Sequence, residues 1–213
     1  MKHIYCISGF GADERVFSKL DFGDSQVHYL PWLLPFSNEK IEAYAKRMSE
    51  KIEQPNPILV GLSFGGMMAI EISKLINTNK IIIISSIKTC HELPLWMRIA
   101  GRLKLDKIFP MRSFGLIEPL ENYNLGIENE EERKLVNAYR KNVSQDYTNW
   151  AIHQILSWKN EWHPGNLSHI HGGKDHIFPI KFIKADYIID DGGHFMIMNR
   201  NKKVNEILSL LSR

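Results

Sequence analysis

Short apolar segments recur along the chain, and glycine or other turn residues close several of them. They occupy residues 3–8, 27–30, 57–62, 80–85, 167–171 and 187–190. Each segment is apolar on both faces and too short for a typical helix, which favours strands buried within a parallel sheet.

Between these segments, apolar residues recur at the spacing of an amphipathic helix. The pattern predicts one helix that starts near Ser37, its expected N-cap, and ends before Pro55. Two further helices are predicted over residues 67–76 and 204–211. Strands that alternate with helices predict an α/β domain with a mostly parallel sheet flanked by helices.

One connection is much longer than a helical crossover requires. Roughly 80 residues separate the strand that ends near Ser86 from the strand that begins near Leu167, where about a dozen residues would be enough. Residues 88–112 interleave basic and apolar side chains, and residues 118–132 are acidic. Amphipathic helices with solvated outer faces explain this pattern, and so does a helical cap over a binding cleft. We expect a single domain, residues 1–213, with the cap at residues 88–145.

The composition excludes several classes of protein. With 44% hydrophobic and 24% charged residues among 213, the chain is neither disordered nor built around a long apolar span. Its net charge of +3, from 27 basic and 24 acidic residues, is too small for a nucleic-acid footprint. Two cysteines and no signal peptide favour a reducing cytoplasm. We therefore expect a soluble cytoplasmic protein without a nucleic-acid partner.

The strongest local motif is Gly61-Leu62-Ser63-Phe64-Gly65, between a predicted strand and a predicted helix. A serine held at a sharp strand-to-helix turn needs small residues two positions before and two positions after it. The turn also directs the Ser63 hydroxyl toward a helix N-terminus, where backbone N–H groups favour a developing oxyanion. The motif predicts Ser63 as a nucleophile, and the alternative is a packing turn with an idle serine.

A serine nucleophile needs a general base, because its hydroxyl is hardly ionised at neutral pH. Among nine histidines, His194 follows the last predicted strand and precedes the last helix. The carboxyl ends of parallel strands meet at one edge of the sheet, which is also where Ser63 is expected. His194 is therefore the predicted base. His3 and His28 lie within predicted strands and are expected to be structural.

The base in turn needs a carboxylate that orients its imidazole. Asp175 follows the penultimate strand and reaches the same edge of the sheet, so it is the predicted acid. Asp190 and Asp191 lie closer to His194 in sequence, at a spacing that suits this role poorly, and they stay as alternatives. For the oxyanion, the backbone N–H groups of Phe64 and Phe10 are the expected donors.

These motifs together resemble the α/β-hydrolase family over nearly the whole chain. The resemblance rests on four motifs in the family's order: the glycine turn at 9–11, the elbow at 61–65, the loop at 171–175 and the Gly-Gly-His at 192–194. It implies a catalytic triad of Ser63, Asp175 and His194, with oxyanion donors at Phe10 and Phe64. It also implies the family's sheet, with the cap inserted after the strand that follows the nucleophile's helix.

The activity that the resemblance implies is that of a cofactor-independent serine hydrolase with an acyl-enzyme intermediate. Because residue 63 is a serine and not an aspartate, carboxylic ester, thioester, amide and activated C–C bonds all stay open as targets, and a carboxylic ester or thioester of a small acyl molecule is the expected substrate. No cofactor and no metal ion are expected. The alternatives are a non-catalytic ligand-binding or receptor module on the same fold, and a cofactor-free C–C hydrolase or lyase.

Two other ligand-binding motifs match the chain less well. Gly9 and Gly11 follow a strand as in dinucleotide-binding proteins, but Glu14 occupies the position of the third glycine. His169 and His171 share one face of a predicted strand and would suit a metal ion, but two glycines separate them from the Asp-His pair that follows. Both alternatives are disfavoured.

Overall fold

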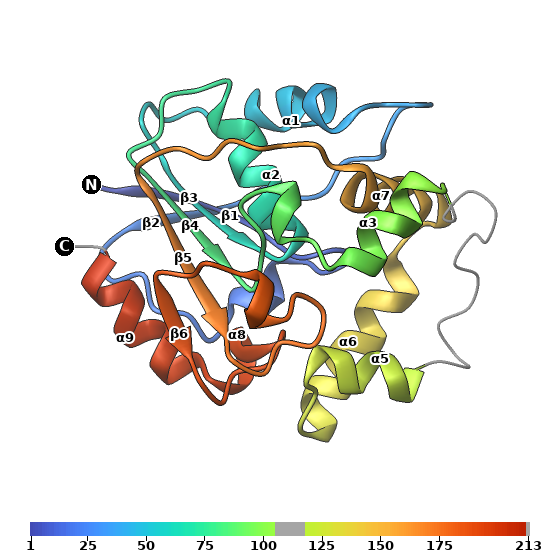
Figure 1. The fold of residues 1–213 in the computed structure, drawn as a ribbon. Coiled ribbons are helices and arrows are strands. Elements are labelled where there is room, and N and C mark those ends of the chain that lie inside the picture. The colour runs from blue at the N-terminus through green and yellow to red at the C-terminus, as the bar shows by residue number, and fades with distance from the viewer. Residues whose placement is uncertain (105–117, 212–213) are drawn as a thin grey trace.

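A parallel sheet forms the centre of the computed structural model, which describes residues 1–104 and 118–211 (Figure 1). Its strands are β1 His3–Ile7, β2 Gln26–Tyr29, β3 Ile58–Leu62, β4 Lys80–Ile84, β5 Leu167–Gly172 and β6 Tyr187–Ile189. Their order in the sheet is β2-β1-β3-β4-β5-β6, and every neighbouring pair is parallel. The strands predicted from the apolar segments, and the parallel α/β sheet, are confirmed.

Helices connect the strands. They are α1 Ile41–Ser49, α2 Phe64–Ser73, α3 Leu95–Arg102, α5 Glu118–Leu125, α6 Glu130–Asn142, α7 Gln145–Ser157, α8 Met196–Asn199 and α9 Asn201–Leu211. Short 3₁₀ helices are η1 Glu14–Phe17, η2 Cys90–Glu92 and η3 Ile180–Phe182. Within the two described ranges, no helix combines the length and apolarity that crossing a membrane requires.

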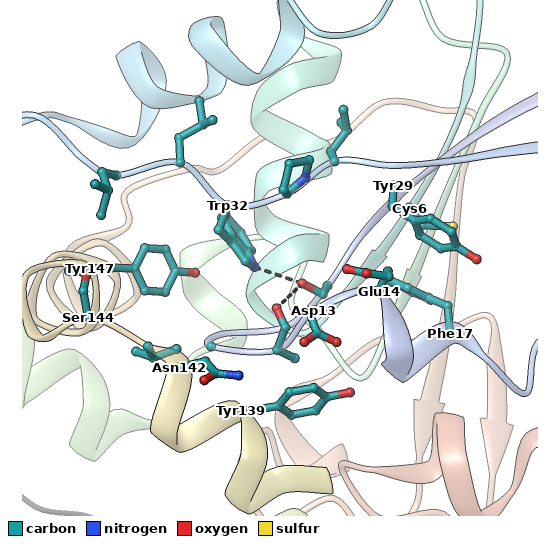
Figure 2. Close-up of a pocket in the computed structure, with 18 residues that line it drawn as sticks. Cys6, Asp13, Glu14, Phe17, Tyr29, Trp32, Tyr139, Asn142, Ser144 and Tyr147 are labelled. Atoms are coloured by element: carbon teal, nitrogen blue, oxygen red, sulfur yellow. Dashed lines mark hydrogen bonds between the residues drawn. The ribbon is translucent and has the colours of Figure 1, made fainter.

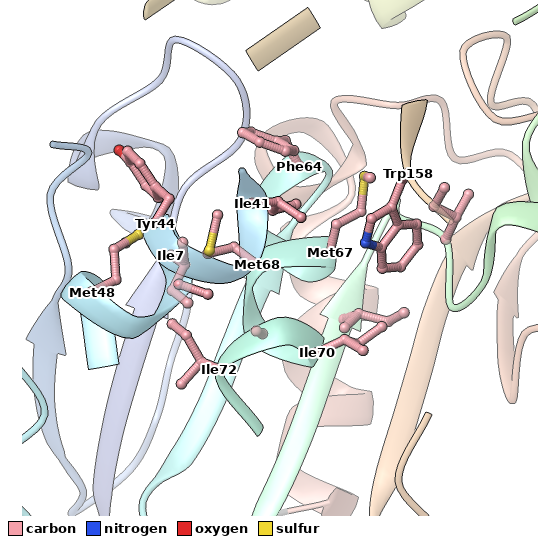
Figure 3. Packing of buried hydrophobic residues seen from close by; sticks show 14 of the residues in the cluster. Ile7, Ile41, Tyr44, Met48, Phe64, Met67, Met68, Ile70, Ile72 and Trp158 are labelled. Carbon is pink, nitrogen blue, oxygen red and sulfur yellow. The ribbon is translucent and has the colours of Figure 1, made fainter. Parts of the chain in front are cut away.

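The sheet separates two hydrophobic layers, because successive side chains of a strand point to opposite faces. In β1, Tyr5 and Ile7 pack on the side of α1 and α2, whereas Ile4 and Cys6 pack on the side of η1, α8 and α9 (Figure 1). Figure 3 shows part of the first layer, in which Tyr44 of α1 and Met68 of α2 meet. Both faces are therefore covered, as the two-sided apolar segments require.

The start of α1 differs from the prediction. The helix begins at Ile41, and its N-cap is Lys40, which makes no side-chain cap bond, so Ser37 as N-cap is wrong. The side-chain oxygen of Gln154 in α7 instead accepts the Ile41 N–H at 3.1 Å. The free N–H groups of a helix start need acceptors, and here a residue far away in the sequence supplies one.

A core substitution tests this layered packing. Ile83 in β4 is fully buried, and Ile83→Ala should lower the free energy of unfolding by about 2–5 kcal/mol through lost burial and a cavity. Ile188 in the edge strand β6 is 51% exposed, so Ile188→Ala should cost at most about 1 kcal/mol. Urea unfolding followed by circular dichroism measures both. Equal losses would contradict the assigned burial.

The long connection between β4 and β5 holds α3, α5, α6 and α7 (Figure 1). Its helices contact the loops at the carboxyl ends of two strands. The N–H of Phe195 after β6 donates to the Leu125 carbonyl at 2.8 Å, and the Phe10 ring after β1 stacks on Tyr147 at 6.1 Å. The amphipathic helices expected here are present in part, whereas Leu105, Asp106, Lys107 and Arg112 lie outside the described residues. The limits of a cap stay a prediction.

Candidate active site

Ser63 occupies a strained turn between β3 and α2. Its φ of 52° and ψ of −119° lie in a region that non-glycine residues rarely adopt, at a cost on the order of 1–3 kcal/mol. Two hydrogen bonds to the neighbouring strand and its loop hold the turn. The Ser63 N–H donates to the Ile84 carbonyl at 2.9 Å, and the Ser86 hydroxyl donates to the Ser63 carbonyl at 2.6 Å.

The glycines around Ser63 allow the strand, the helix and the loop after β1 to approach one another. A Cβ atom at Gly61 would overlap the backbone of Gly65, and a Cβ atom at Gly65 would overlap the carbonyl groups of Ile7 and Ser8. These close backbone contacts explain why the residues two positions before and two positions after the serine must be small.

Three of the predicted site residues form one hydrogen-bonded line. His194 Nε2 lies 2.9 Å from the Ser63 hydroxyl oxygen, and His194 Nδ1 lies 2.8 Å from Asp175 Oδ2. The carboxylate only accepts, so Nδ1 carries the proton, and Nε2 is free to accept the proton of the serine hydroxyl. His194 and Asp175 are buried and Ser63 is half-buried. The loops after β3, β5 and β6 thus meet at one edge of the sheet.

The surroundings of Asp175 keep it ionised. Its Oδ1 accepts the backbone N–H groups of Ile177 at 2.8 Å and Phe178 at 2.9 Å, while Oδ2 faces His194. Burial raises the pKa of Asp175, but the charge and hydrogen bond of His194 together with the other donors outweigh burial, so its pKa lies below the ordinary value. A charged carboxylate therefore lies against the imidazole.

Of the two alternative acids, Asp191 is engaged elsewhere. Its oxygens accept from Arg200 at 2.8 Å and Lys203 at 2.7 Å on the protein surface. The hydrogen bond from Lys203, with a smaller contribution from that of Arg200, lowers the pKa of Asp191 to about 2. Within the described ranges, Asp175 is the carboxylate that contacts His194, so the geometry favours it over Asp190 and Asp191.

The two expected oxyanion donors lie beside Ser63. Phe64 is the first residue of α2, and Gly9 packs so close that a Cβ atom there would be 3.4 Å from the Ser63 Cβ. The next residue in that loop is Phe10. Neither the Phe10 N–H nor the Phe64 N–H has a hydrogen-bond partner among the described residues. Both groups are therefore available to an oxygen that develops negative charge near Ser63.

The sequence interpretation missed Trp32, which supports both donor segments (Figure 2). Its indole N–H lies 3.0 Å from the Ser8 hydroxyl and 3.2 Å from the Gly9 carbonyl, and the Ser8 hydroxyl donates to the Ala12 carbonyl at 2.6 Å. The Trp32 ring also stacks on Phe64 at 5.0 Å. Its place just after the strand at 27–30, at the edge where function gathers, was the available signal.

A cavity of about 540 Å³ is lined in part by the loop that follows β1 (Figure 2). Its walls come from that loop, from residues 29–34 and from the corner between α6 and α7, and they include the aromatic rings of Trp32, Tyr139 and Tyr147. Ser63 and His194 do not line it. The cavity is of ligand size, and it is lined by residues on either side of Phe10 in that loop.

Neither alternative ligand motif forms the site that its pattern suggested. The glycine turn after β1 leads into η1, a 3₁₀ helix of four residues, and not into a helix long enough to hold a pyrophosphate. The imidazoles of His169 and His171 bond to each other and to a carbonyl group. Among the described residues, the group with metal-ligand spacing is Cys90, His91 and Glu161 on the surface, with donor atoms within 4.8 Å of one another.

Comparisons with known proteins identify the fold. No family model and no curated protein match the chain. Among solved structures, it resembles a lipase-esterase related protein from Clostridium acetobutylicum, with 16% identity and a TM-score of 0.69 over 99% of this chain and 94% of that one. A bromoperoxidase from Bacillus anthracis is 16% identical and matches with a TM-score of 0.70 over 99% of this chain and 91% of that one. A thermophilic esterase from Thermogutta terrifontis is 15% identical and matches with a TM-score of 0.68 over 100% of this chain and 91% of that one.

These similarities define the fold of the chain, and not its reaction. The chain has the α/β-hydrolase fold, and the loops with Ser63, Asp175 and His194 follow one another in the order in which this fold carries its nucleophile, acid and base. One of the three similar proteins is titled a bromoperoxidase and two are titled esterases or esterase-related. The fold therefore does not select the reaction, which has to be argued from the site.

Proposed function

We propose that the protein is a cofactor-independent serine hydrolase that cleaves a carboxylic ester or thioester of a small molecule. The observation that carries this proposal is the line from Asp175 through His194 to Ser63, with consecutive contacts of 2.8 and 2.9 Å. This is the arrangement in which a histidine activates a serine hydroxyl and a carboxylate fixes the histidine tautomer. The esterase titles of two similar structures support the same class.

In the proposed reaction, His194 Nε2 takes the hydroxyl proton as Ser63 Oγ bonds to the carbonyl carbon of the substrate. The carbonyl oxygen becomes an oxyanion, which the N–H groups of Phe10 and Phe64 bind. Asp175 stabilises the imidazolium. His194 then gives its proton to the leaving oxygen or sulfur, the bond to the carbonyl carbon breaks, and an acyl-serine remains.

Water completes the cycle by the same steps in reverse. His194 takes a proton from water as the water oxygen bonds to the acyl carbon, and the second oxyanion occupies the same donors. The proton returns to Ser63 Oγ as the ester bond to the enzyme breaks, which releases the acid. Besides the substrate and water, the proposed steps use only groups of the chain.

The inserted helices have a role in this proposal as a cap at residues 88–145. The hydrogen bond from the Phe195 N–H to the Leu125 carbonyl supports it, because it joins the insertion to the loop that carries His194. Cys6 and Cys90 are both free thiols, which suits the reducing cytoplasm in which we place the enzyme.

A fluorophosphonate probe tests the proposal directly. The probe should label the protein once, and mass mapping should place the label on Ser63. A series of acyl esters and thioesters of increasing chain length should then show turnover and size the acyl site. Well-folded protein without label or turnover, together with a ligand that raises its melting temperature, would favour the non-catalytic binding module. Turnover confined to a substrate with an activated C–C bond would favour the lyase alternative.

A further inference from the structure

Two fully buried histidines lie directly behind the acid of the proposed triad, and the reaction above does not use them. His169 and His171 belong to β5, point to the same side of the sheet, and have no exposed surface. Their rings meet edge to face at a centroid separation of 5.1 Å. Buried imidazoles require hydrogen-bond partners, so their partners reveal their protonation.

The partners fix the position of each proton. His171 Nε2 lies 2.8 Å from the Phe178 carbonyl oxygen, which only accepts, so Nε2 donates. His171 Nδ1 lies 3.2 Å from His169 Nε2. In a neutral His171, Nδ1 is an acceptor, and His169 Nε2 must then donate to it. His169 Nδ1 is left without a proton, and it has no hydrogen-bond partner in the described part of the chain.

His171 also contacts the turn that shapes the acid. The Phe178 residue whose carbonyl accepts from His171 donates its own N–H to Asp175 Oδ1 at 2.9 Å. His171 Nε2 lies 3.6 Å from Asp175 Oδ2, the oxygen that bonds to His194. One imidazole N–H therefore supports the turn from 175 to 178 and faces the same carboxylate oxygen as His194.

The charges around the pair act in both directions. Burial dominates and lowers the pKa of both imidazoles, that of His169 well below its ordinary value. The groups that face them from neighbouring elements are Asp175 and His194 from the site loops, Glu92 from η2, Lys88 after β4, and Asp186, whose carboxylate accepts the His169 backbone N–H. The pair is thus neutral around pH 7.

We infer that His171, oriented by His169, is a positioning residue that holds the Asp175 turn against His194, and that this support requires both imidazoles to be neutral. The inference rests on the proposed function and concerns the pH range of the same site. A proton on His171 Nδ1 would remove the acceptor that His169 needs and place two N–H groups against each other. Acid that protonates the pair therefore removes this support from the Asp175 turn.

The lowered pKa values of the two histidines determine how the support for the Asp175 turn changes with pH. The pKa of each histidine in the folded state lies below that of an unfolded histidine, about 6.5. The unfolded chain then binds more protons as the pH falls below that value, so the support weakens with acid and is complete above it. A single ionising group gives log kcat/KM an acid limb of slope one. The buried pair adds a second protonation, so the wild-type acid limb should become steeper than slope one in the pH range where the pair takes up its proton.

Two substitutions at His171 separate the role of its N–H donor from the effect of protonating its imidazole. His171→Phe keeps a ring but removes the N–H that holds Phe178, and kcat should fall about 10²-fold with little change in KM, as expected when a catalytic group is misplaced. His171→Gln retains an N–H donor that binds no proton in this range, so kcat should stay near wild type while the acid limb falls to slope one. His28→Phe is the matched control, because His28 pairs with His3 at 3.1 Å on β1 and β2, away from the site.

A readout independent of turnover is the downfield proton resonance of His194 Nδ1–H. It should be present in wild type and in His28→Phe, and lost or shifted in His171→Phe. An unchanged resonance in folded His171→Phe, a wild-type acid limb of slope one, or an acid limb that His171→Gln leaves unchanged would each overturn the inference. If the probe does not label wild type, the proposed function fails, and the resonance alone decides the positioning role. If His171→Phe does not fold, the acid limb of His171→Gln decides.

Discussion

Ser63→Ala should abolish ester or thioester turnover, lowering kcat by about 10⁶-fold, because the substitution removes the oxygen that forms the acyl-enzyme. The fold should persist, since His194 is the hydrogen-bond partner of the Ser63 hydroxyl among residues 1–104 and 118–211, and the turn is held by backbone groups and Ser86. Steady-state kinetics and the melting temperature of the purified variant measure both effects.

Ser73→Ala is the control for this substitution. Ser73 lies at the end of the same helix, is also half-buried, and donates to a backbone carbonyl at 2.7 Å, so its loss should leave kcat unchanged. Turnover by Ser63→Ala at the wild-type rate, in protein free of wild-type enzyme, would remove Ser63 from the proposed mechanism.

Asp175→Asn should lower kcat by about 10³–10⁴-fold. The amide keeps the shape of the carboxylate, but it no longer stabilises the imidazolium, and its NH₂ group opposes the proton on His194 Nδ1. Asp191→Asn should leave kcat unchanged, because Asp191 bonds to Arg200 and Lys203 on the surface. Kinetics on the two variants, with circular dichroism as a check on folding, would assign the acid. The reverse result would return that role to the loop before His194.

The strands and the three site residues were predictable because their signals are local. Each strand is a short apolar segment, and Ser63, Asp175 and His194 each follow such a segment in the chain. Parallel strands place those positions at one edge of the sheet, so the sequence order alone predicts that they meet. The close backbone contacts at Gly61 and Gly65 then set how closely β3, α2 and the loop after β1 approach one another.

The remaining features depend on contacts between distant residues. Gln154 caps α1 across 113 positions, and the Trp150 indole N–H donates to the Glu39 carbonyl across 111, so no local pattern predicts where α1 begins. The His169 and His171 spacing suggested a metal ion because the two share a face. That face is buried in the protein interior. There, His169 Nε2 bonds to His171 Nδ1, and His171 Nε2 bonds to the Phe178 carbonyl.

The end of α5 and the turn that follows it are bonded to the segment after His194, and these bonds have a mechanical consequence. Phe195 bonds to Leu125 at 2.8 Å, Asn199 to the Gly126 carbonyl at 3.0 Å, and Arg200 to Glu128 at 2.7 Å. A simple lid opens without disturbing what lies beneath it. Here these bonds join the end of α5 and its following turn to the segment that begins with His194. Lifting this part of the chain must therefore either break the bonds or withdraw the proposed base from Ser63. Access from this side and readiness to react are therefore opposed.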